Sequence, residues 1–233
     1  MPLFPANKIL VVEDEQAISN LLVKFLANKG YEVIAASDGR SCLKLFNSFV
    51  PDLIILDLNL PDVSGFQLCQ QLQNSSDVCI LILSGLDDTR DKIKGFRQGA
   101  DDYLTKPFDL EELAYRVEAI LRRANKNPQL PSDQCLIFPQ LTVDPSMREV
   151  TINEEKVHFT SLEFDILYLL ASGPNQTWSR LELLNKIWGT EYTGDMRLVD
   201  VHVGQIRRKI QSRSTEAPMI ETVRGIGYRF RTN

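Results

Sequence analysis

Few residues in this chain are suited to zinc binding or to disulfide formation. Its 233 residues include four cysteines and two histidines. The cysteines, Cys42, Cys69, Cys79 and Cys135, stand far apart and form no pair at metal-ligand spacing. We therefore expect no zinc site, and we expect small buried or half-buried thiols of the kind found in a reducing compartment.

Long apolar runs are also missing. No run approaches the roughly 20 apolar residues that a membrane-spanning helix needs. The N-terminal segment MPLFPANK lacks the charged-then-apolar layout of a signal peptide. Because hydrophobic residues make up 43% of the chain and charged residues 24%, the composition is that of an ordinary globular protein. We expect a cytoplasmic protein that does not insert into membranes.

The net charge of −5 is unevenly distributed along the chain. The acidic excess lies in residues 1–124, whereas residues 125–233 carry acidic and basic residues in equal number, and residues 197–231 are rich in arginine. Such a division indicates different partners for the two halves. For the basic segment, nucleic acid is one candidate partner, and an ordinary solvated face is the alternative.

Residues 1–124 alternate short apolar runs with amphipathic segments of helical period. The apolar runs are residues 8–12, 31–36, 53–56, 79–83 and 102–104. The helical segments are residues 15–29, 39–49, 64–73, 89–98 and 109–124. Continuous apolar strands separated by amphipathic helices predict a parallel sheet with helices on both faces, and therefore an α/β domain.

Residues 125–134 are polar, contain two prolines and show no periodicity, which predicts a linker between domain 1–124 and domain 135–233. The second domain is expected to have short strands at 135–138, 141–143, 149–152 and 157–159, with a turn at 153–156. Helices are expected at 161–171, 179–188 and 196–211, before a closing hairpin of 220–223 and 228–231. The first two helices carry cap residues, Thr160 with Glu163 and then Ser179, so this domain is α+β.

Polar side chains follow several predicted strands of the first domain. Glu13 and Asp14 end the first strand and Asp57 ends the third, and these strands are neighbours in a flavodoxin-like sheet of order 2-1-3-4-5. Three carboxylates at one edge repel one another unless a cation joins them, and oxygen ligands suit Mg²⁺. Ser84 and Lys106 end the fourth and fifth strands. Each residue alone is ordinary in a turn or loop, but together they offer the positioning and charge neutralisation that a transferring phosphoryl group needs.

The segments that carry these residues resemble those of response regulator receiver domains. They are residues 11–15 (VVEDE), 56–61 (LDLNLP), 83–85 (LSG) and 99–108 (GADDYLTKPF). The resemblance implies that Asp57 accepts a phosphoryl group from a sensor histidine kinase. The Mg²⁺ ligands that it implies are Glu13, Asp14, Asp57 and the backbone carbonyl group of Asn59.

The same resemblance implies that Ser84 and Lys106 contact the phosphoryl oxygens and that Tyr103 swings inward as Ser84 moves. An ordinary half-buried strand residue is the alternative for Tyr103. Gly85 is smaller than the alanine usual in this family, and the polar Asn59 is placed to orient a water molecule. Both features favour a phosphorylated state with a short lifetime.

Charged residues gather on the fourth helix, fifth strand and fifth helix of the first domain. They are Lys92, Asp101, Asp102, Glu112, Arg116 and Arg123. Scattered surface charge is one interpretation, because exposed ion pairs contribute only about 0–1 kcal/mol each. The receiver resemblance implies instead a symmetric homodimer face that forms on phosphorylation. We then expect Lys92 to meet Glu112, and Asp102 to meet Arg116, across the dimer.

Residues 197–210 combine an apolar stripe with a polar face. The stripe consists of Val199, Val203, Ile206 and Ile210 at helical spacing. The opposite face carries Arg197, Val201, Gln205 and Arg208. Such a helix fits the major groove of DNA, and an arginine beside a glycine turn, Arg224, fits the minor groove.

Residues 134–233 resemble the winged-helix effector domain of the OmpR/PhoB regulators. The resemblance rests on residues 159–164 (FTSLEF), 188–189 (WG), 197–210 and 223–230 (VRGIGYRF). It implies binding to tandem half-sites in double-stranded promoter DNA and contact of the loop 189–196 with RNA polymerase. The residues expected to bind DNA are Arg197, Val201, His202, Gln205, Arg207, Arg208 and Arg224.

Two positions of this helix depart from the usual pattern, in which polar residues or arginine are common. Gly204 costs roughly 1 kcal/mol relative to alanine, which indicates either close approach to DNA or mere tolerance. Gln205 favours adenine, whereas arginine favours guanine, and the missing charge lowers nonspecific affinity. His202 is expected to be packed or to contact phosphate rather than to bind a metal.

Two rival interpretations are open at this point. A metal-dependent phosphatase of similar fold needs a second aspartate two residues after its nucleophile, and Asn59 stands there. A constitutive DNA-binding protein would keep the first domain only for dimerisation or docking, and retained function in Asp57→Ala would support it. We favour a phosphorylation-driven DNA-binding dimer, which is no enzyme beyond accepting and losing its phosphoryl group.

Overall fold

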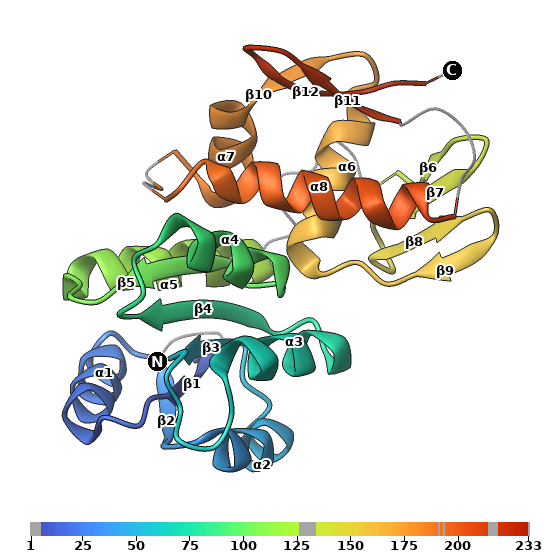
Figure 1. The fold of residues 1–233 in the computed structure, drawn as a ribbon. Helices are drawn as coiled ribbons and strands as arrows, with labels where there is room; N and C mark the ends of the chain where they lie inside the picture. Colours follow the sequence, from blue (N-terminus) through green and yellow to red (C-terminus); the bar gives the residue numbers. More distant parts are fainter. Residues whose placement is uncertain (1–5, 126–133, 191, 193, 214–218, 233) are drawn as a thin grey trace. The chain divides into compact units, whose positions relative to one another are not determined.

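The computed structural model describes residues 6–125, 134–190, 192, 194–213 and 219–232. It divides into two compact units, Met1–Ala124 and Asn125–Asn233 (Figure 1). The predicted linker lies almost wholly outside the described residues. None of the helices described is long and apolar enough to cross a membrane.

The first unit is built on a five-stranded parallel sheet. Its strands are β1 (Lys8–Val12), β2 (Glu32–Ala36), β3 (Leu53–Leu56), β4 (Cys79–Ser84) and β5 (Asp102–Thr105). Their order is β2-β1-β3-β4-β5, as the sequence predicts. Strands β3 and β4 are buried along their whole length, because a parallel sheet covered on both faces leaves no strand face for water.

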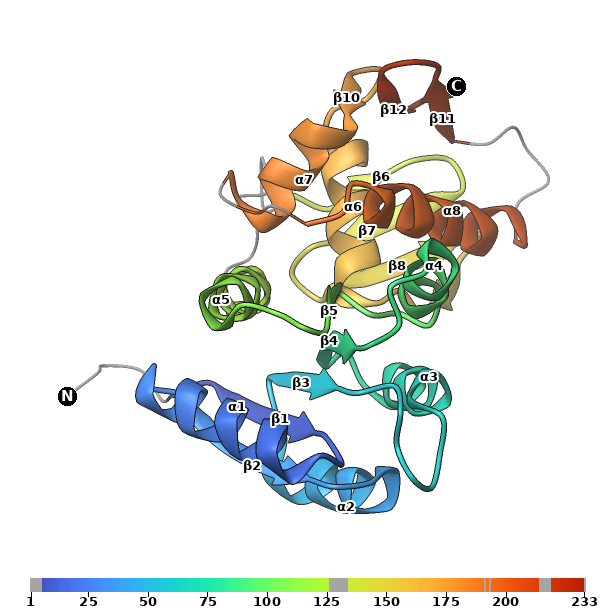
Figure 2. The same ribbon diagram turned by 60° about the vertical axis from the view of Figure 1, so that its left-hand side comes forward.

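Five helices cover this sheet: α1 (Gln16–Asn28), α2 (Gly39–Phe49), α3 (Gly65–Ser75), α4 (Thr89–Arg97) and α5 (Leu110–Asn125). One apolar core joins alternate residues of β1, β3 and β4 to Leu22 of α1 and to Leu113 and Val117 of α5. Helices α3 and α4 lie on the side of the sheet away from α1 and α5 (Figure 2). Because the strands are parallel, their carboxyl ends all lie at one edge of the sheet, and the polar residues are found there.

The second unit begins with a four-stranded antiparallel sheet. Its strands are β6 (Leu136–Ile137), β7 (Leu141–Asp144), β8 (Glu149–Ile152) and β9 (Glu155–Val157), in sequence order. The turn between β8 and β9 takes only Asn153 and Glu154, both in the left-handed region (φ 50° and 69°). The prediction of a turn over 153–156 and a strand over 157–159 was therefore wrong by two residues.

Three helices and a second sheet complete this unit. The helices are α6 (Ser161–Ser172), α7 (Arg180–Trp188) and α8 (Arg197–Gln211). The predicted capping box opens α6, and the predicted cap Ser179 opens α7, where Glu182 completes a capping box as well. The sheet has the order β10-β12-β11, from β10 (Thr177–Ser179), β11 (Ile220–Val223) and β12 (Gly227–Phe230). We call β11, β12 and the turn between them the wing hairpin. Strand β10, which directly precedes α7, was not predicted.

Candidate functional site

Three carboxylates meet at the edge of the first sheet where β1 and β3 end. Oxygen atoms of Glu13, Asp14 and Asp57 all lie within 4.8 Å of one another. Glu13 and Asp57 are only 3% and 4% exposed, whereas Asp14 is exposed. The parallel pairing of Val12 with Leu56 brings the two strand ends together, so the residues that follow them face the same space.

Lys106 binds two of these carboxylates at once. Its Nζ donates to Asp57 Oδ2 at 2.5 Å and to Glu13 Oε2 at 2.7 Å. Burial raises the pKa of Glu13 and outweighs the opposing hydrogen bond from Lys106. Burial alone would lower the pKa of Lys106, but its hydrogen bonds to Asp57 and Glu13 prevail and raise that pKa, so the ammonium group keeps its charge.

Backbone contacts fix the segment that carries Asp57. The Asp57 amide donates to the Val12 carbonyl oxygen at 2.9 Å, and the Asn59 amide donates to Asp57 Oδ1 at 3.0 Å. Gly65, the first residue of α3, donates its amide to the Leu58 carbonyl oxygen at 3.0 Å. A Cβ atom at Gly65 would lie 2.5 Å from the carbonyl oxygen of Asp57, so no other residue fits there without a backbone shift.

Ser84 is the last residue of β4, and Tyr103 lies within the neighbouring strand β5. Ser84 is fully buried, and its Oγ accepts the Leu86 amide at 3.3 Å. The Tyr103 ring is turned inward with 6% exposed, and its hydroxyl donates to the Leu86 carbonyl oxygen at 2.7 Å. Burial raises the pKa of Tyr103 to about 12, although its hydrogen bond with Ser84 acts in the other direction. Tyr103 therefore connects β5 to the start of the β4–α4 loop.

The charged residues on α4, β5 and α5 make their pairs within the chain. Arg116 Nη1 donates to both oxygens of Asp102, at 2.8 and 3.1 Å, while Arg116 Nη2 donates to Glu112 at 2.7 Å. Lys92 pairs with Asp87 at 2.7 Å. The two residues expected to meet across a dimer, Asp102 and Arg116, thus form a bidentate pair within one chain, and a contact across a dimer stays a prediction that requires this pair to exchange partners.

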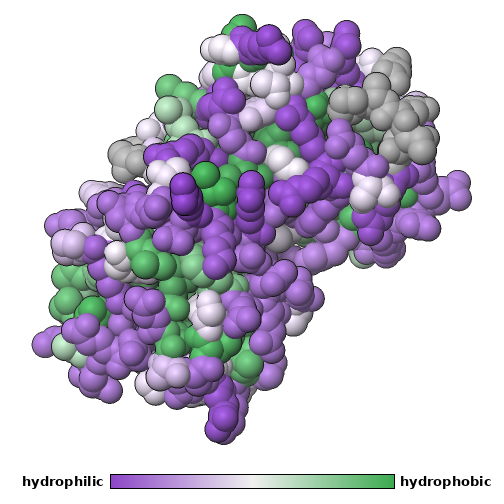
Figure 3. Space-filling model, viewed as in Figure 1, coloured by the Kyte–Doolittle hydropathy of each residue, from purple (hydrophilic) through white to green (hydrophobic). Residues whose placement is uncertain are grey.

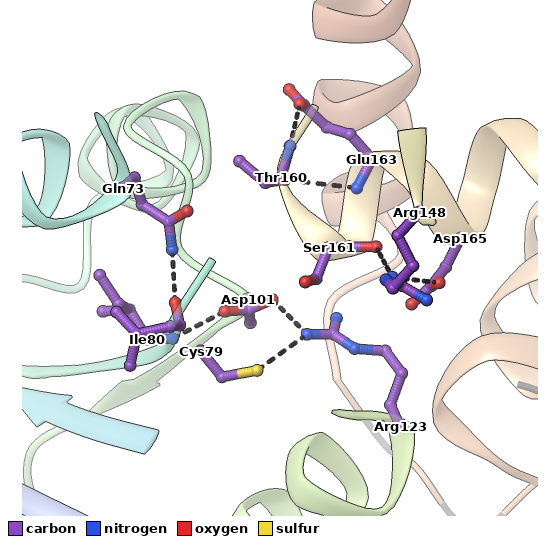
Figure 4. Close-up of polar contacts among 11 residues, drawn as sticks. Gln73, Cys79, Ile80, Asp101, Arg123, Arg148, Thr160, Ser161, Glu163 and Asp165 are labelled. Atoms are coloured by element: carbon purple, nitrogen blue, oxygen red, sulfur yellow. Dashed lines mark hydrogen bonds and ion pairs between the residues drawn. The ribbon is translucent and has the colours of Figure 1, made fainter. Parts of the chain in front are cut away.

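Asp101 and Arg123 form a second internal pair, which Figure 4 shows in close-up. Asp101 also accepts the Ile80 amide at 2.7 Å, and Arg123 Nη2 contacts Cys79 Sγ at 3.4 Å. The two side chains are only 4% and 0% exposed. The expectation that Asp101 and Arg123 lie on an exposed dimer face was wrong, because they neutralise each other inside the protein.

Helix α8 has the predicted buried stripe and a polar outer face. Val199, Val203 and Ile206 are fully buried and Ile210 is 4% exposed. Arg197, Val201, Gln205 and Arg208 remain exposed or partly exposed, as does Arg224 in the wing hairpin. Hydrophilic residues predominate where α8 runs across the face of the second unit seen in Figure 3.

Two residues expected to bind DNA lie elsewhere. His202 is 1% exposed, so the expectation of a DNA contact was wrong and the packed alternative holds. Arg207 turns towards β11, where its Nε donates to the Ile220 carbonyl oxygen and its Nη2 to Thr222 Oγ1, both at 2.9 Å. In this structure Arg207 therefore holds the wing hairpin to α8.

Sequence reasoning missed a polar network between α8 and the wing hairpin. Asp200 Oδ1 accepts from Arg180 Nε and from the Tyr228 hydroxyl, each at 2.6 Å. The guanidinium groups of Arg180 and Arg207 lie 5.1 and 5.3 Å from the Tyr228 ring centre. No local signal identifies this network, because its members come from three separate segments.

The loop 189–196 is described only in part, since residues 191 and 193 lie outside the described residues. Tyr192 stacks on Trp188, with ring centres 5.6 Å apart, which anchors the middle of the loop to the end of α7. Leu181 and Met196 are 55% and 51% exposed.

Comparison with known families assigns both units. Residues 9–118 match the family model of the response regulator receiver domain, and residues 154–230 match that of the C-terminal domain of transcriptional regulatory proteins.

Known proteins are similar over nearly the whole chain. A probable transcriptional regulator, ycf27 of Guillardia theta, is 39% identical over 229 residues, or 96% of this chain and 90% of its own. The transcriptional regulatory protein TrcR of Mycobacterium tuberculosis is 38% identical over 226 residues, or 96% and 86%. Among solved structures, the response regulator DrrB, a Thermotoga maritima OmpR/PhoB homolog, is 30% identical with a TM-score of 0.52 and covers 97% of this chain and 100% of its own.

Proposed function

This chain belongs to the OmpR/PhoB family of two-component response regulators, and from that premise we propose that phosphorylation of Asp57 converts it into a dimer that binds tandem half-sites in promoter DNA. Its receiver and DNA-binding domains make it a regulator of transcription rather than an enzyme. It acts in the cytoplasm, where a sensor histidine kinase presents its phosphohistidine.

The observation that carries the phosphorylation site is the contact between Lys106 and Asp57 in the buried acidic cluster. An oxygen of Asp57 attacks the phosphorus of the phosphohistidine, so that a P–O bond forms as the P–N bond breaks and the imidazole leaves. Lys106 lies at 2.5 Å from Asp57 Oδ2 and follows the new negative charge onto the phosphoryl oxygens.

The acidic cluster also fits Mg²⁺. Three carboxylates with oxygens within 4.8 Å of one another supply more negative charge than Lys106 alone neutralises. Glu13, Asp14, Asp57 and the carbonyl group of Asn59 would hold the ion, which when bound supplies charge neutralisation to the incoming phosphoryl group. With the ion bound, a Glu13 oxygen would bind the metal in place of the Lys106 ammonium group, so the Glu13–Lys106 contact would be lost.

The signal then passes to Ser84 and Tyr103. A charged phosphoryl oxygen on Asp57 is a strong acceptor for the Ser84 hydroxyl, so Ser84 turns towards it. The Ser84 oxygen then releases the Leu86 amide, from which it now accepts at 3.3 Å, and the β4–α4 loop moves. Tyr103 follows the loop because its hydroxyl is bonded to the Leu86 carbonyl oxygen. The inward ring is the rotamer that this contact favours.

Dimerisation is an exchange of partners on α4, β5 and α5. Arg116 gives up internal contacts to meet Asp102 of a second copy, and Lys92 leaves Asp87 for the Glu112 of that copy. Such an exchange changes the number of ion pairs little, so a modest shift of the loop is enough to move the monomer–dimer equilibrium.

In the dimer, two effector domains bind adjacent half-sites. Helix α8 enters the major groove with Arg197, Val201, Gln205 and Arg208, and Arg224 of the wing hairpin enters the neighbouring minor groove. The loop 189–196, part of which lies outside the described residues, is the surface offered to RNA polymerase. Tethering raises the effective concentration of the second effector domain and so the affinity.

The direct test compares DNA affinity with and without Mg²⁺ and beryllium fluoride, a phosphoryl mimic, for the wild-type chain and for Asp57→Ala. We expect the mimic to tighten binding to a duplex with two half-sites in the wild type alone. A duplex with a single half-site is the control and should respond much less. Equal affinity in every condition would contradict the switch and leave a DNA-binding protein that phosphorylation does not regulate.

A further inference from the structure

An acidic residue, Asp200, flanks the polar face of α8 on the side of the wing hairpin. Asp200 is 41% exposed at its side chain and stands one turn after the start of the helix. A carboxylate there repels DNA phosphates and lowers affinity. Some favourable effect of Asp200 on DNA binding must therefore offset this repulsion.

The contacts of Asp200 with other elements provide this favourable effect. One of its oxygens accepts two hydrogen bonds at 2.6 Å, from Arg180 at the start of α7 and from Tyr228 of the wing hairpin. Burial, followed by the hydrogen bond to Asp200, raises the pKa of Tyr228 to about 12, so the phenol stays protonated and remains a donor. A single carboxylate thus joins α8, α7 and β12.

The remaining contacts leave Tyr228 little freedom. The guanidinium groups of Arg180 and Arg207 both lie close to its ring, and Tyr228 is 4% exposed. Tyr228 pairs with Trp178 of β10, and a Cβ atom at neighbouring Gly227 would lie 2.0 Å from the Trp178 carbonyl oxygen. The wing hairpin therefore packs closely on the strand that leads into α7, and Asp200 connects this assembly to α8.

We propose that Asp200 is a positioning residue for DNA recognition: through Arg180 and Tyr228 it fixes the wing hairpin at the angle to α8 that lets Arg224 and α8 engage neighbouring grooves of one duplex. The inference rests on the proposed DNA-binding surface and concerns a residue that contacts no base. Its negative charge lowers the nonspecific affinity for DNA, and the fixed geometry raises the specific affinity by more than this loss.

The test uses the full chain and two duplexes of equal length, one selected by the wild-type chain from a random-sequence pool and one unrelated to it. The variants are Asp200→Asn and Tyr228→Phe. Glu149→Gln, which removes a surface negative charge from the same unit, is the matched control. Fluorescence of Trp178 and Trp188, both in this unit, verifies that each variant is folded.

We expect Asp200→Asn to weaken binding to the selected duplex about tenfold, equivalent to roughly 1.4 kcal/mol, although a negative charge is lost. Binding to the unrelated duplex should be unchanged or tighter, so the ratio of the two affinities falls. Tyr228→Phe should act in the same direction, and Glu149→Gln should leave the ratio unchanged. In addition, Arg224→Ala should cost affinity in the wild type and little in the Asp200→Asn background.

Tighter binding of Asp200→Asn to both duplexes would overturn the proposal, because that is the effect of charge removal alone. Additive effects of Arg224→Ala and Asp200→Asn would overturn it as well. If beryllium fluoride does not change the DNA affinity of the wild-type chain, the phosphorylation switch is contradicted and the Asp200 proposal is not. The comparison of the Asp200 variants can still be interpreted, because every variant is measured on the same duplexes.

Discussion

Removing the guanidinium group of Arg116 should destabilise the first unit strongly. Arg116 makes a bidentate pair with Asp102, at 2.8 and 3.1 Å, and the two side chains are 11% and 1% exposed. Removing one partner of a buried pair costs about 3–5 kcal/mol, because the other charge is left buried and unpaired. Since Arg116 keeps some access to water, we expect Arg116→Ala to lower the free energy of unfolding by about 3 kcal/mol, at the lower end of that range.

The two tryptophans provide a convenient assay. Both Trp178 and Trp188 lie in the second unit, so their fluorescence during urea unfolding follows that unit alone. Far-ultraviolet circular dichroism follows both units. A transition that is present in the dichroism and absent from the fluorescence therefore belongs to the first unit, and its midpoint gives the stability of that unit.

Lys29→Ala is the matched control. Lys29 pairs with Glu111 at 2.8 Å, but the two side chains are 40% and 60% exposed, so water replaces the lost contact. The dichroism transition should move to much lower urea for Arg116→Ala and hardly at all for Lys29→Ala. If both variants unfold at the same urea concentration, the internal Arg116–Asp102 pair is not the stabilising contact that the structure indicates.

Three glycines give further predictions, each tested by one substitution to alanine. Gly65→Ala should destabilise the first unit by about 1–3 kcal/mol and abolish phosphorylation by acetyl phosphate, because its Cβ meets backbone atoms of Asp57 and Leu58 at 2.5 Å. Gly204→Ala should stabilise the second unit by roughly 1 kcal/mol in thermal unfolding, because its Cβ meets no atom within 4 Å and alanine favours the helix; an unchanged or lower melting temperature would contradict this. Gly85→Ala, also without a neighbour within 4 Å, should fold normally and lengthen the lifetime of the phosphorylated chain, since a methyl group beside Ser84 hinders attacking water.

The first unit could be predicted in detail because its signals are local. Apolar runs such as residues 53–56 are buried on both faces and have no other environment to occupy. Alternating strands and helices with right-handed connections predict a doubly wound parallel sheet, and the order 2-1-3-4-5 is the one implied by the flavodoxin-like receiver resemblance. The phosphorylation site then follows from strand order, because residues at successive strand ends share one edge of the sheet.

Contacts that depend on distant segments could not be predicted. Strand β10 has three residues and no alternation, and it exists because Gly227 and Tyr228 pair with it from about 50 residues away. The directions of Arg123 and Arg207 were equally hidden, since a long arginine side chain reaches an internal carboxylate or carbonyl group as readily as a partner. His202 stands between the buried Val199 and Val203, and its helical position alone leaves both burial and exposure open.

The close packing of Gly65 against Asp57 gives the phosphorylation site two unequal sides. On the side of α3, a Cβ atom at Gly65 would collide with backbone atoms of Asp57 and Leu58, so no larger residue fits there. On the side of the β4–α4 loop, Gly85 has open space around it, and the loop is bonded through the side chains of Ser84 and Tyr103. Substitutions on the two sides therefore have different consequences. Those at the start of α3 eliminate the response to phosphorylation, whereas those at residues 85–88 adjust its strength and duration. Relatives whose responses last for different times should therefore differ in the loop and not in the helix.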